Sequence, residues 1–466
     1  MPPNSTPKNV GYRKKTRSAQ SKATVWIIGG LAIGAVAGLF AAQAWLESYL
    51  ESEPFHLRIE ASLGRVLHAE AKLSPLHRES TALAVERLTL AGQHGAPFSR
   101  ARIQDLRAEV DLTGLWQRLW KVDNLSCQRL DLNFDSPSDL SEAPETSPHP
   151  APGWMRSLLP NRTQIASIQT DRAVFTHEGS ELRETRLIAK PQAEGWDIAL
   201  EAGELNSPDL PLMTLTQARL FLRDGEVTLR NARLLVKTGG QLALTGEWAN
   251  HNRADLHIQL ENLALEPLLP KWWQACLRGN LSGELHMLRA PGTTNADFNG
   301  DVHLTNAKLE GLPLLNQLDA FLGNPRFRQV PLRTASAHIV KTAKRTEFQN
   351  IDLDADGILK MCGWVVLEKG ELNGNLTLGL SPALVQWLPG ARSKVFTESR
   401  DGYVWAPFQL SGTSEHPVED LSPRLVATLV KTLTDSAGNL PDSIPKSVPE
   451  VTQGVLDAVK SLLPKK

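Results

Sequence analysis

The chain has 466 residues, with 50 basic and 51 acidic side chains and a net charge of −1. This length allows two or three domains and a substantial core. Residues 1–22 hold six basic residues and no acidic one, so the remainder has 44 basic against 51 acidic residues, a net charge of −7. Such a mildly acidic remainder gives no electrostatic reason to expect DNA or RNA binding. Three cysteines, an odd number, are too few for a disulfide framework.

A membrane anchor is predicted near the N-terminus. The basic tail, residues 1–23, is followed by TVWIIGGLAIGAVAGLFAAQAWL at residues 24–46, without a charged side chain. As a helix this run would be about 34 Å long, enough for the hydrocarbon core of a bilayer. It is too long for a signal peptide, and Trp45 and Leu46 do not form a small-residue cleavage site. The basic tail places the N-terminus in the cytoplasm, so the following body is expected to be exported.

Glycines recur every four residues within this run, at Gly30, Gly34 and Gly38. That spacing allows close approach of a second membrane helix. Glycine is also common in membrane helices that do not pair, so both interpretations stay open.

Period-two alternation of apolar residues dominates the body and predicts strands with one apolar and one polar face. Glycine-rich turns separate the alternating segments, as in antiparallel meanders. We therefore expect a mainly β protein in which one elongated, curved antiparallel sheet follows the membrane helix. Three alternating segments carry the aliphatic positions Leu256, Ile258, Leu260, Val302, Leu304, Leu376, Leu378 and Leu380.

The composition suggests boundaries along the body. Residues 136–153 contain five prolines and no apolar periodicity, which is typical of a linker or a long exposed loop. A smaller β segment, residues 54–135, would precede it, and a larger one, residues 154–422, would follow. Short helical patches are expected at residues 113–120, 263–277 and 312–322.

The tail, residues 423–466, changes to helical periodicity. Apolar residues four apart are expected to line helix faces, namely Leu425, Leu429, Leu433, Val451, Val455 and Val459. Such a tail could contact a membrane or a protein partner. We favour a helix that covers the terminal edge of the sheet.

No catalytic signature is present: the chain lacks a nucleophile elbow, a phosphate-binding glycine loop and a dinucleotide fingerprint. The histidines show no metal-ligand spacing, and His251 and His257, six apart, are interpreted as surface residues. Asp352, Asp354 and Asp356 alternate beside a glycine but lack the closing glutamate of a calcium loop, so a solvated strand face is expected. We expect no enzyme activity, no cofactor and no metal site.

An apolar sheet face must be hidden from water. The eight aliphatic residues given above either line a common groove that holds lipid acyl chains, or form the interior of a closed sandwich. In the groove, burial would favour lipid by about 25 cal/mol per Å² of apolar surface.

The order of basic tail, membrane helix and strand-rich body resembles the AsmA-like proteins of Gram-negative envelopes. The similarity is strongest over residues 279–420, where a strand leads through Gly311 into a leucine-rich helix. A closing strand there reads P-F-x-L-S-G-T-x-x-x-P from Pro407 to Pro417. One departure is Ala307, where the family pattern has a turn glycine.

This resemblance implies an inner-membrane protein with a periplasmic β-groove, linked to phospholipid movement and outer-membrane integrity. The chain is shorter than the family members thought to span the periplasm. The alternative is a structural or assembly factor that binds envelope or secretion-system proteins without carrying lipid. No recognisable motif identifies the lipid, the direction or energy source of transport, the protein partner or the oligomeric state.

Overall fold

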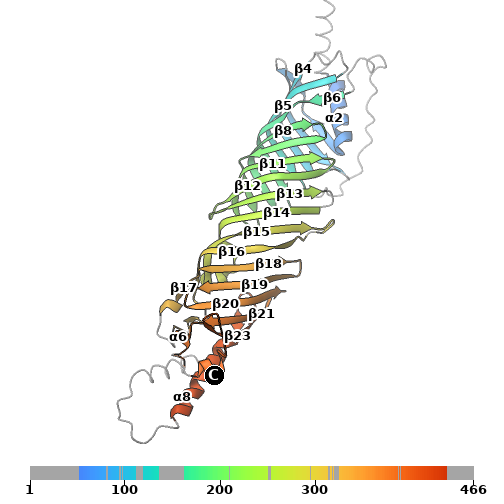
Figure 1. Ribbon diagram of the computed structural model, residues 1–466. Coiled ribbons are helices and arrows are strands. Elements are labelled where there is room, and N and C mark those ends of the chain that lie inside the picture. The colour runs from blue at the N-terminus through green and yellow to red at the C-terminus, as the bar shows by residue number, and fades with distance from the viewer. Residues whose placement is uncertain are drawn as a thin grey trace, which may run out of the picture.

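The computed structural model describes most of the body of the chain. The described residues are 52–79, 82–93, 96, 98–111, 119–135, 162–208, 210–249, 253–293, 295–312, 315–316, 318–319, 325–386, 388 and 390–437. Within these ranges all 24 strands belong to one sheet. Figure 1 shows this sheet as an elongated ladder, with the N-terminal strands at one end and the C-terminal strands at the other. The expectation of a mainly β protein with one large curved sheet is confirmed.

Strands of the N-terminal half run from residue 69 to residue 249. They are β1 (Ala69–Leu73), β2 (Leu76–Glu79), β3 (Ala82–Gly92), β4 (Arg100–Asp111), β5 (Leu119–Asn133), β6 (Arg162–Ile165), β7 (Ile168–His177), β8 (Ser180–Gln192), β9 (Gly195–Glu201), β10 (Glu204–Ser207), β11 (Leu210–Arg223), β12 (Glu226–Val236) and β13 (Gln241–Ala249).

Strands of the C-terminal half complete the sheet. They are β14 (Arg253–Ala264), β15 (Leu277–Arg289), β16 (Asp297–Glu310), β17 (Gln329–Pro331), β18 (Thr334–Lys341), β19 (Arg345–Ala355), β20 (Leu359–Glu368), β21 (Glu371–Leu380), β22 (Glu398–Arg400), β23 (Tyr403–Gly412) and β24 (Pro417–Glu419).

Helices are few and short in the described ranges. They are α2 (Glu53–Leu67), η3 (Glu266–Leu268), α4 (Lys271–Cys276), η4 (Pro325–Phe327), α6 (Pro382–Val385), α7 (Ala391–Lys394) and α8 (Leu421–Ala437). None of them has the length and apolar character of a membrane-crossing helix. The predicted anchor, residues 24–46, and its Gly30, Gly34 and Gly38 lie outside the described residues.

The sheet is antiparallel along almost its whole length, and many of its successive strands pair directly as hairpins. The exception is β5, which pairs in parallel with β6 and β7. A parallel pair requires a long connection between its strands, and residues 136–161, which include the predicted linker, lie between β5 and β6. The two predicted β segments are therefore continuous in one sheet.

Two features bend the sheet. Gly246 and Gly283 have φ angles of +143° and +158°, and a Cβ at either position would lie within 2.3 Å of a carbonyl oxygen on the neighbouring strand. Asn262, Asn306 and Asn350 adopt left-handed φ angles near strand irregularities. Asparagine tolerates this conformation, and bulges increase strand twist. The sequence thus builds curvature into the central and C-terminal strands.

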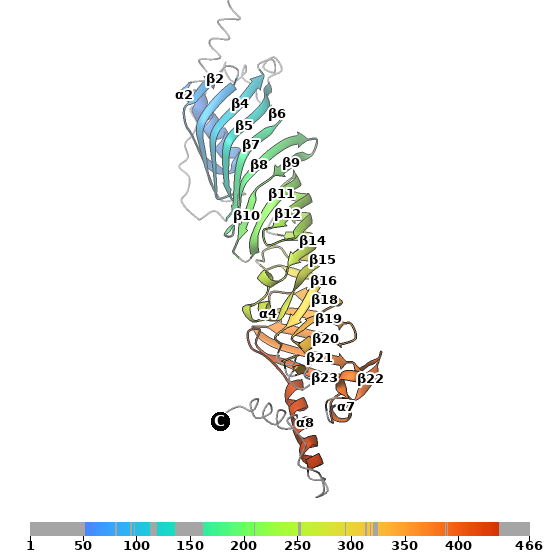
Figure 2. The same cartoon turned by 90° about the vertical axis from the view of Figure 1, so that its left-hand side faces the viewer.

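The first described element corrects one sequence expectation. Residues 53–67 form helix α2, whereas a β segment was expected from residue 54. Leu63 and Leu67 of this helix pack against a small core containing Leu88, Leu90 and Phe98. Figure 2 shows α2 beside the first strands, at one end of the sheet.

Helices also cover the opposite end. Leu421, Leu425 and Leu429 of α8 are at most 4% exposed and belong to the same core as α6, α7 and β23. The predicted helical periodicity at Leu425 and Leu429 is confirmed. Residues 438–466, with the second predicted helix face, lie outside the described residues.

Replacing Leu425 with alanine should lower the free energy of unfolding by about 2–5 kcal/mol, because buried methylene groups are lost and a cavity remains. Val418→Ala is the matched control, since Val418 is 59% exposed and its change should stay within about 0.5 kcal/mol. Urea unfolding of the full chain, followed by circular dichroism, measures both. An unchanged midpoint for Leu425→Ala would mean that α8 does not stabilise this end.

Candidate functional site

The register of the central strands defines one apolar face. Leu256, Ile258 and Leu260 alternate on β14, and their direct partners on β15 are Met287, Leu285 and Gly283. Directly opposite residues of an antiparallel pair lie on the same face of the sheet. The alternation predicted from the sequence therefore continues from strand to strand.

The middle of this face forms one hydrophobic cluster. Its buried members come from β11, β12, β14 and β16 and include Leu260 and Val302. Many neighbours are only partly buried. These are Leu182, Leu200, Leu205, Leu229, Leu242, Leu244, Ile258, Leu281, Leu285, Ala337 and Ile339. We call these residues and the buried members of the cluster the central apolar face.

The other predicted groove residues lie in a different environment. Leu376, Leu378 and Leu380 of β21 are 5%, 0% and 0% exposed. They belong to the core that includes side chains of α6, α7 and α8, and Leu304 packs against it. The eight predicted positions are thus divided between the central apolar face and a protein-filled terminal core. Leu256 is partly buried and shares its face with Ile258.

No second sheet lies over the central apolar face within the described ranges, because all described strands belong to one sheet. The described helices pack mainly on β1, β15, β16 and β23. Figure 2 shows the same distribution, with α2 and α8 at opposite ends and α4 beside the lower central strands. On β11–β14 the buried members of the face, such as Met213 and Leu260, lie beside aliphatic side chains that keep partial contact with solvent, namely Leu229, Leu242, Leu244 and Ile258.

The sheet curves towards its apolar face. Trp248 of β13 is separated from β7 by β8, by β9 and β10, and by β11 and β12, yet its ring lies 6.0 Å from the His177 ring of β7. Trp248 aligns with Ala254 and Arg289 in the register, one row beyond Leu256. This contact brings distant strands together on the apolar side.

Arg289 places positive charge at this contact. Its guanidinium carbon lies 5.8 Å from the centre of the Trp248 ring. Its Nε and Nη1 atoms are buried without a hydrogen-bond partner within the described part of the chain. Polar atoms that are buried without a hydrogen-bond partner are unfavourable, even on a side chain that is only partly buried as a whole. The site is therefore suited to an anionic group next to an apolar surface.

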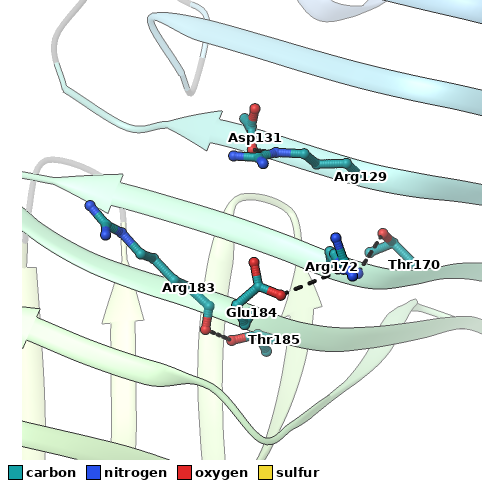
Figure 3. Close-up of polar contacts among 7 residues, drawn as sticks. All are labelled: Arg129, Asp131, Thr170, Arg172, Arg183, Glu184 and Thr185. Atoms are coloured by element: carbon teal, nitrogen blue, oxygen red, sulfur yellow. Dashed lines mark hydrogen bonds and ion pairs between the residues drawn. The ribbon is translucent and has the colours of Figure 1, made fainter.

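The N-terminal half of the apolar face also contains small polar groups. Thr185 is fully buried, and its hydroxyl donates to the carbonyl oxygen of Arg183 over 3.4 Å, as Figure 3 shows. Cys127 aligns with the buried Thr170 across the parallel pair. Burial raises the pKa of the Cys127 thiol, which favours its neutral form.

Charged residues cover the opposite, polar face. Figure 3 shows one cross-strand pair, Arg172 with Glu184, whose charged atoms are 3.6 Å apart. Other pairs join different strands: Arg186 with Glu201 links the paired strands β8 and β9, and Arg230 with Asp197 links β12 to β9 across β11. Exposed pairs of this kind contribute little to stability. They keep this face hydrated, so the two faces differ sharply in polarity.

The structure corrects the interpretation of the aspartate series. Asp352 and Asp356 are exposed, as expected for a solvated strand face. Asp354 is 4% exposed and forms ion pairs with Arg333 and Lys360. It is a buried structural residue whose partners come from neighbouring segments.

Sequence reasoning also missed one group of polar residues. His257 was compared with His251, but its direct partner in the sheet is His286, from the next strand. Asp255 lies beside them. Only the β14–β15 register could have revealed this group, because the two histidines are far apart in the chain.

No protein-family model, curated protein or solved structure matched the chain.

Leu378→Glu should destabilise the chain by several kcal/mol, because it buries an unpaired charge in the terminal core. Ile258→Glu should keep the β-type circular dichroism spectrum and cost much less, because Ile258 is partly exposed on the central apolar face. Urea unfolding of both full-length variants provides the comparison. Equal loss of β structure in the two would mean that the central face is the interior of a closed core.

Proposed function

We propose that this protein is a non-enzymatic, membrane-anchored lipid carrier of the AsmA-like type. Residues 24–46 anchor it in the bacterial inner membrane, and the β body lies in the periplasm. The central apolar face holds the acyl chains of phospholipids that move between the envelope membranes, and it thereby supports outer-membrane integrity.

The observation that carries this proposal is the single-layered central apolar face. Its aliphatic residues are aligned across β8–β16, and many are only partly buried. Contact with water is unfavourable for such a surface, and each buried methylene group of a bound acyl chain would contribute about 0.8 kcal/mol. A lipid tail can supply many methylene groups in an extended form. The curved face therefore matches an acyl chain better than a compact polar ligand.

Arg289 supports a phospholipid over a neutral lipid. Its unpartnered Nε and Nη1 atoms belong to the row next to the apolar pair Leu256 and Met287. A guanidinium group binds phosphate through parallel hydrogen bonds. A headgroup phosphate at Arg289 would leave its acyl chains against the neighbouring aliphatic residues.

The dimensions of the sheet agree with a carrier that extends from a membrane. At about 4.8 Å per strand, the path from β1 to β23 spans roughly 80 Å. The hydrocarbon core of a bilayer is about 30 Å thick. A body attached through residues 24–46 would hold much of its apolar face outside the bilayer.

Site-specific photo-crosslinking in living cells tests the proposal. A photo-reactive amino acid at Leu244 should crosslink to phospholipid, because Leu244 lies on the central apolar face. Thr245 is the matched control, since the next residue of the strand points to the opposite face and is exposed. Radiolabelled phosphate in the growth medium reveals lipid attached to the purified full chain.

Lipid labelling at Leu244 but not at Thr245 is expected. Equal labelling at both positions would reflect general contact with membranes. Crosslinks from Leu244 to a protein, without lipid, would contradict lipid carriage and support the assembly-factor alternative.

A further inference from the structure

A cluster of three metal-binding residue types lies on the polar face of the central strands. Asp255 and His257 flank Leu256 on β14, and His286 is on β15. Because successive strand residues alternate between faces, these three side chains project away from the central apolar face. The cluster is therefore separate from the proposed lipid site.

The register holds the two histidines side by side. His257 and His286 are direct partners, and their rings stack with centroids 4.5 Å apart and an interplanar angle of 6°. The Nε2 atom of His286 lies 2.6 Å from Oδ1 of Asp255. One ligand atom from each of the three residues lies within 4.8 Å of the others.

From this geometry we propose that Asp255, His257 and His286 bind a divalent transition-metal ion, with Zn²⁺ as the preferred occupant. Zinc takes imidazole nitrogen and carboxylate oxygen ligands at about 2.0–2.2 Å. Modest side-chain rotations would direct the three ligand atoms to one centre. Imidazole favours zinc, copper and nickel over magnesium and calcium, which prefer sites made of oxygen alone.

The ion would link β14 to β15 on the polar side of the sheet, opposite the central apolar face. Leu256, between the two β14 ligands, faces Gly246 on one side and Met287 on the other. Gly246 has no side chain to support this row. A metal bridge on the polar face would fix the β14–β15 register, while Gly246 leaves the β13–β14 side of Leu256 without a side-chain partner. The exposed position of the cluster leaves room for water as a further ligand.

A second histidine–carboxylate pair on the same face provides a control. His338 of β18 lies 2.8 Å from Asp301 of β16 through Nδ1. The described residues contain no third ligand close enough to complete a group there. This pair should not hold zinc firmly, although it has the same chemistry and is also at the surface.

Zinc binding to the full chain tests the proposal. The protein is purified without a polyhistidine tag, stripped with a chelator and titrated with Zn²⁺ by calorimetry. One tight equivalent is expected for the wild-type chain and for His338→Gln. That equivalent should be lost in His257→Gln and His286→Gln. Asp255→Asn should also weaken binding strongly, because the neutral amide oxygen replaces one of the three proposed ligands.

Replacement of Zn²⁺ by Co²⁺ adds a spectroscopic readout, since visible absorption bands report on coordination by the histidines. Circular dichroism of each stripped variant confirms that the fold is retained without metal. Absence of a saturable site in the wild type would overturn the proposal. So would zinc binding that survives in His257→Gln and His286→Gln, or that is lost equally in His338→Gln.

Discussion

The structure depends on one constraint: a sheet with one apolar face must remove that face from water. In this chain protein side chains meet the requirement at both ends. The α2 helix packs beside Leu88 and Phe98, and α8 buries Leu425 and Leu429 in the terminal core. Between the ends, the described residues leave the central apolar face only partly covered. The lipid that we propose as its ligand would complete this burial.

Curvature connects this constraint to function. Gly246 and Gly283 permit close approach of neighbouring strands, while left-handed asparagines accompany irregular pairing. The bend faces the apolar side, where His177 and Trp248 meet across the intervening strands. Charged pairs cover the other side. Shape and polarity thus favour an extended amphipathic ligand on one face and solvent on the other.

Local patterns predicted much of the fold because the alternation of apolar and polar residues in a strand is visible within a few residues of sequence. Leu256, Ile258 and Leu260 are an example, and the spacing of Leu425 and Leu429 likewise predicted a helix. Non-local relations were less accessible. Leu378 was assigned to the groove although its neighbours from α6, α7 and α8 form a filled core. Asp354 required partners from other segments, and the proximity of His257 to His286 required the strand register. Helix α2 was missed because residues 54–135 were assigned as a whole to one β segment.

An experimental density map of the full chain, purified in a lipid nanodisc without added detergent, tests the central claim most directly. The lipid account predicts elongated, non-protein density along the central apolar face from β8 to β16. It also predicts density for a phosphate group near Arg289. Polypeptide packed continuously over Leu244, Ile258 and Leu285 would contradict the account, because the face would then be the interior of an ordinary protein core.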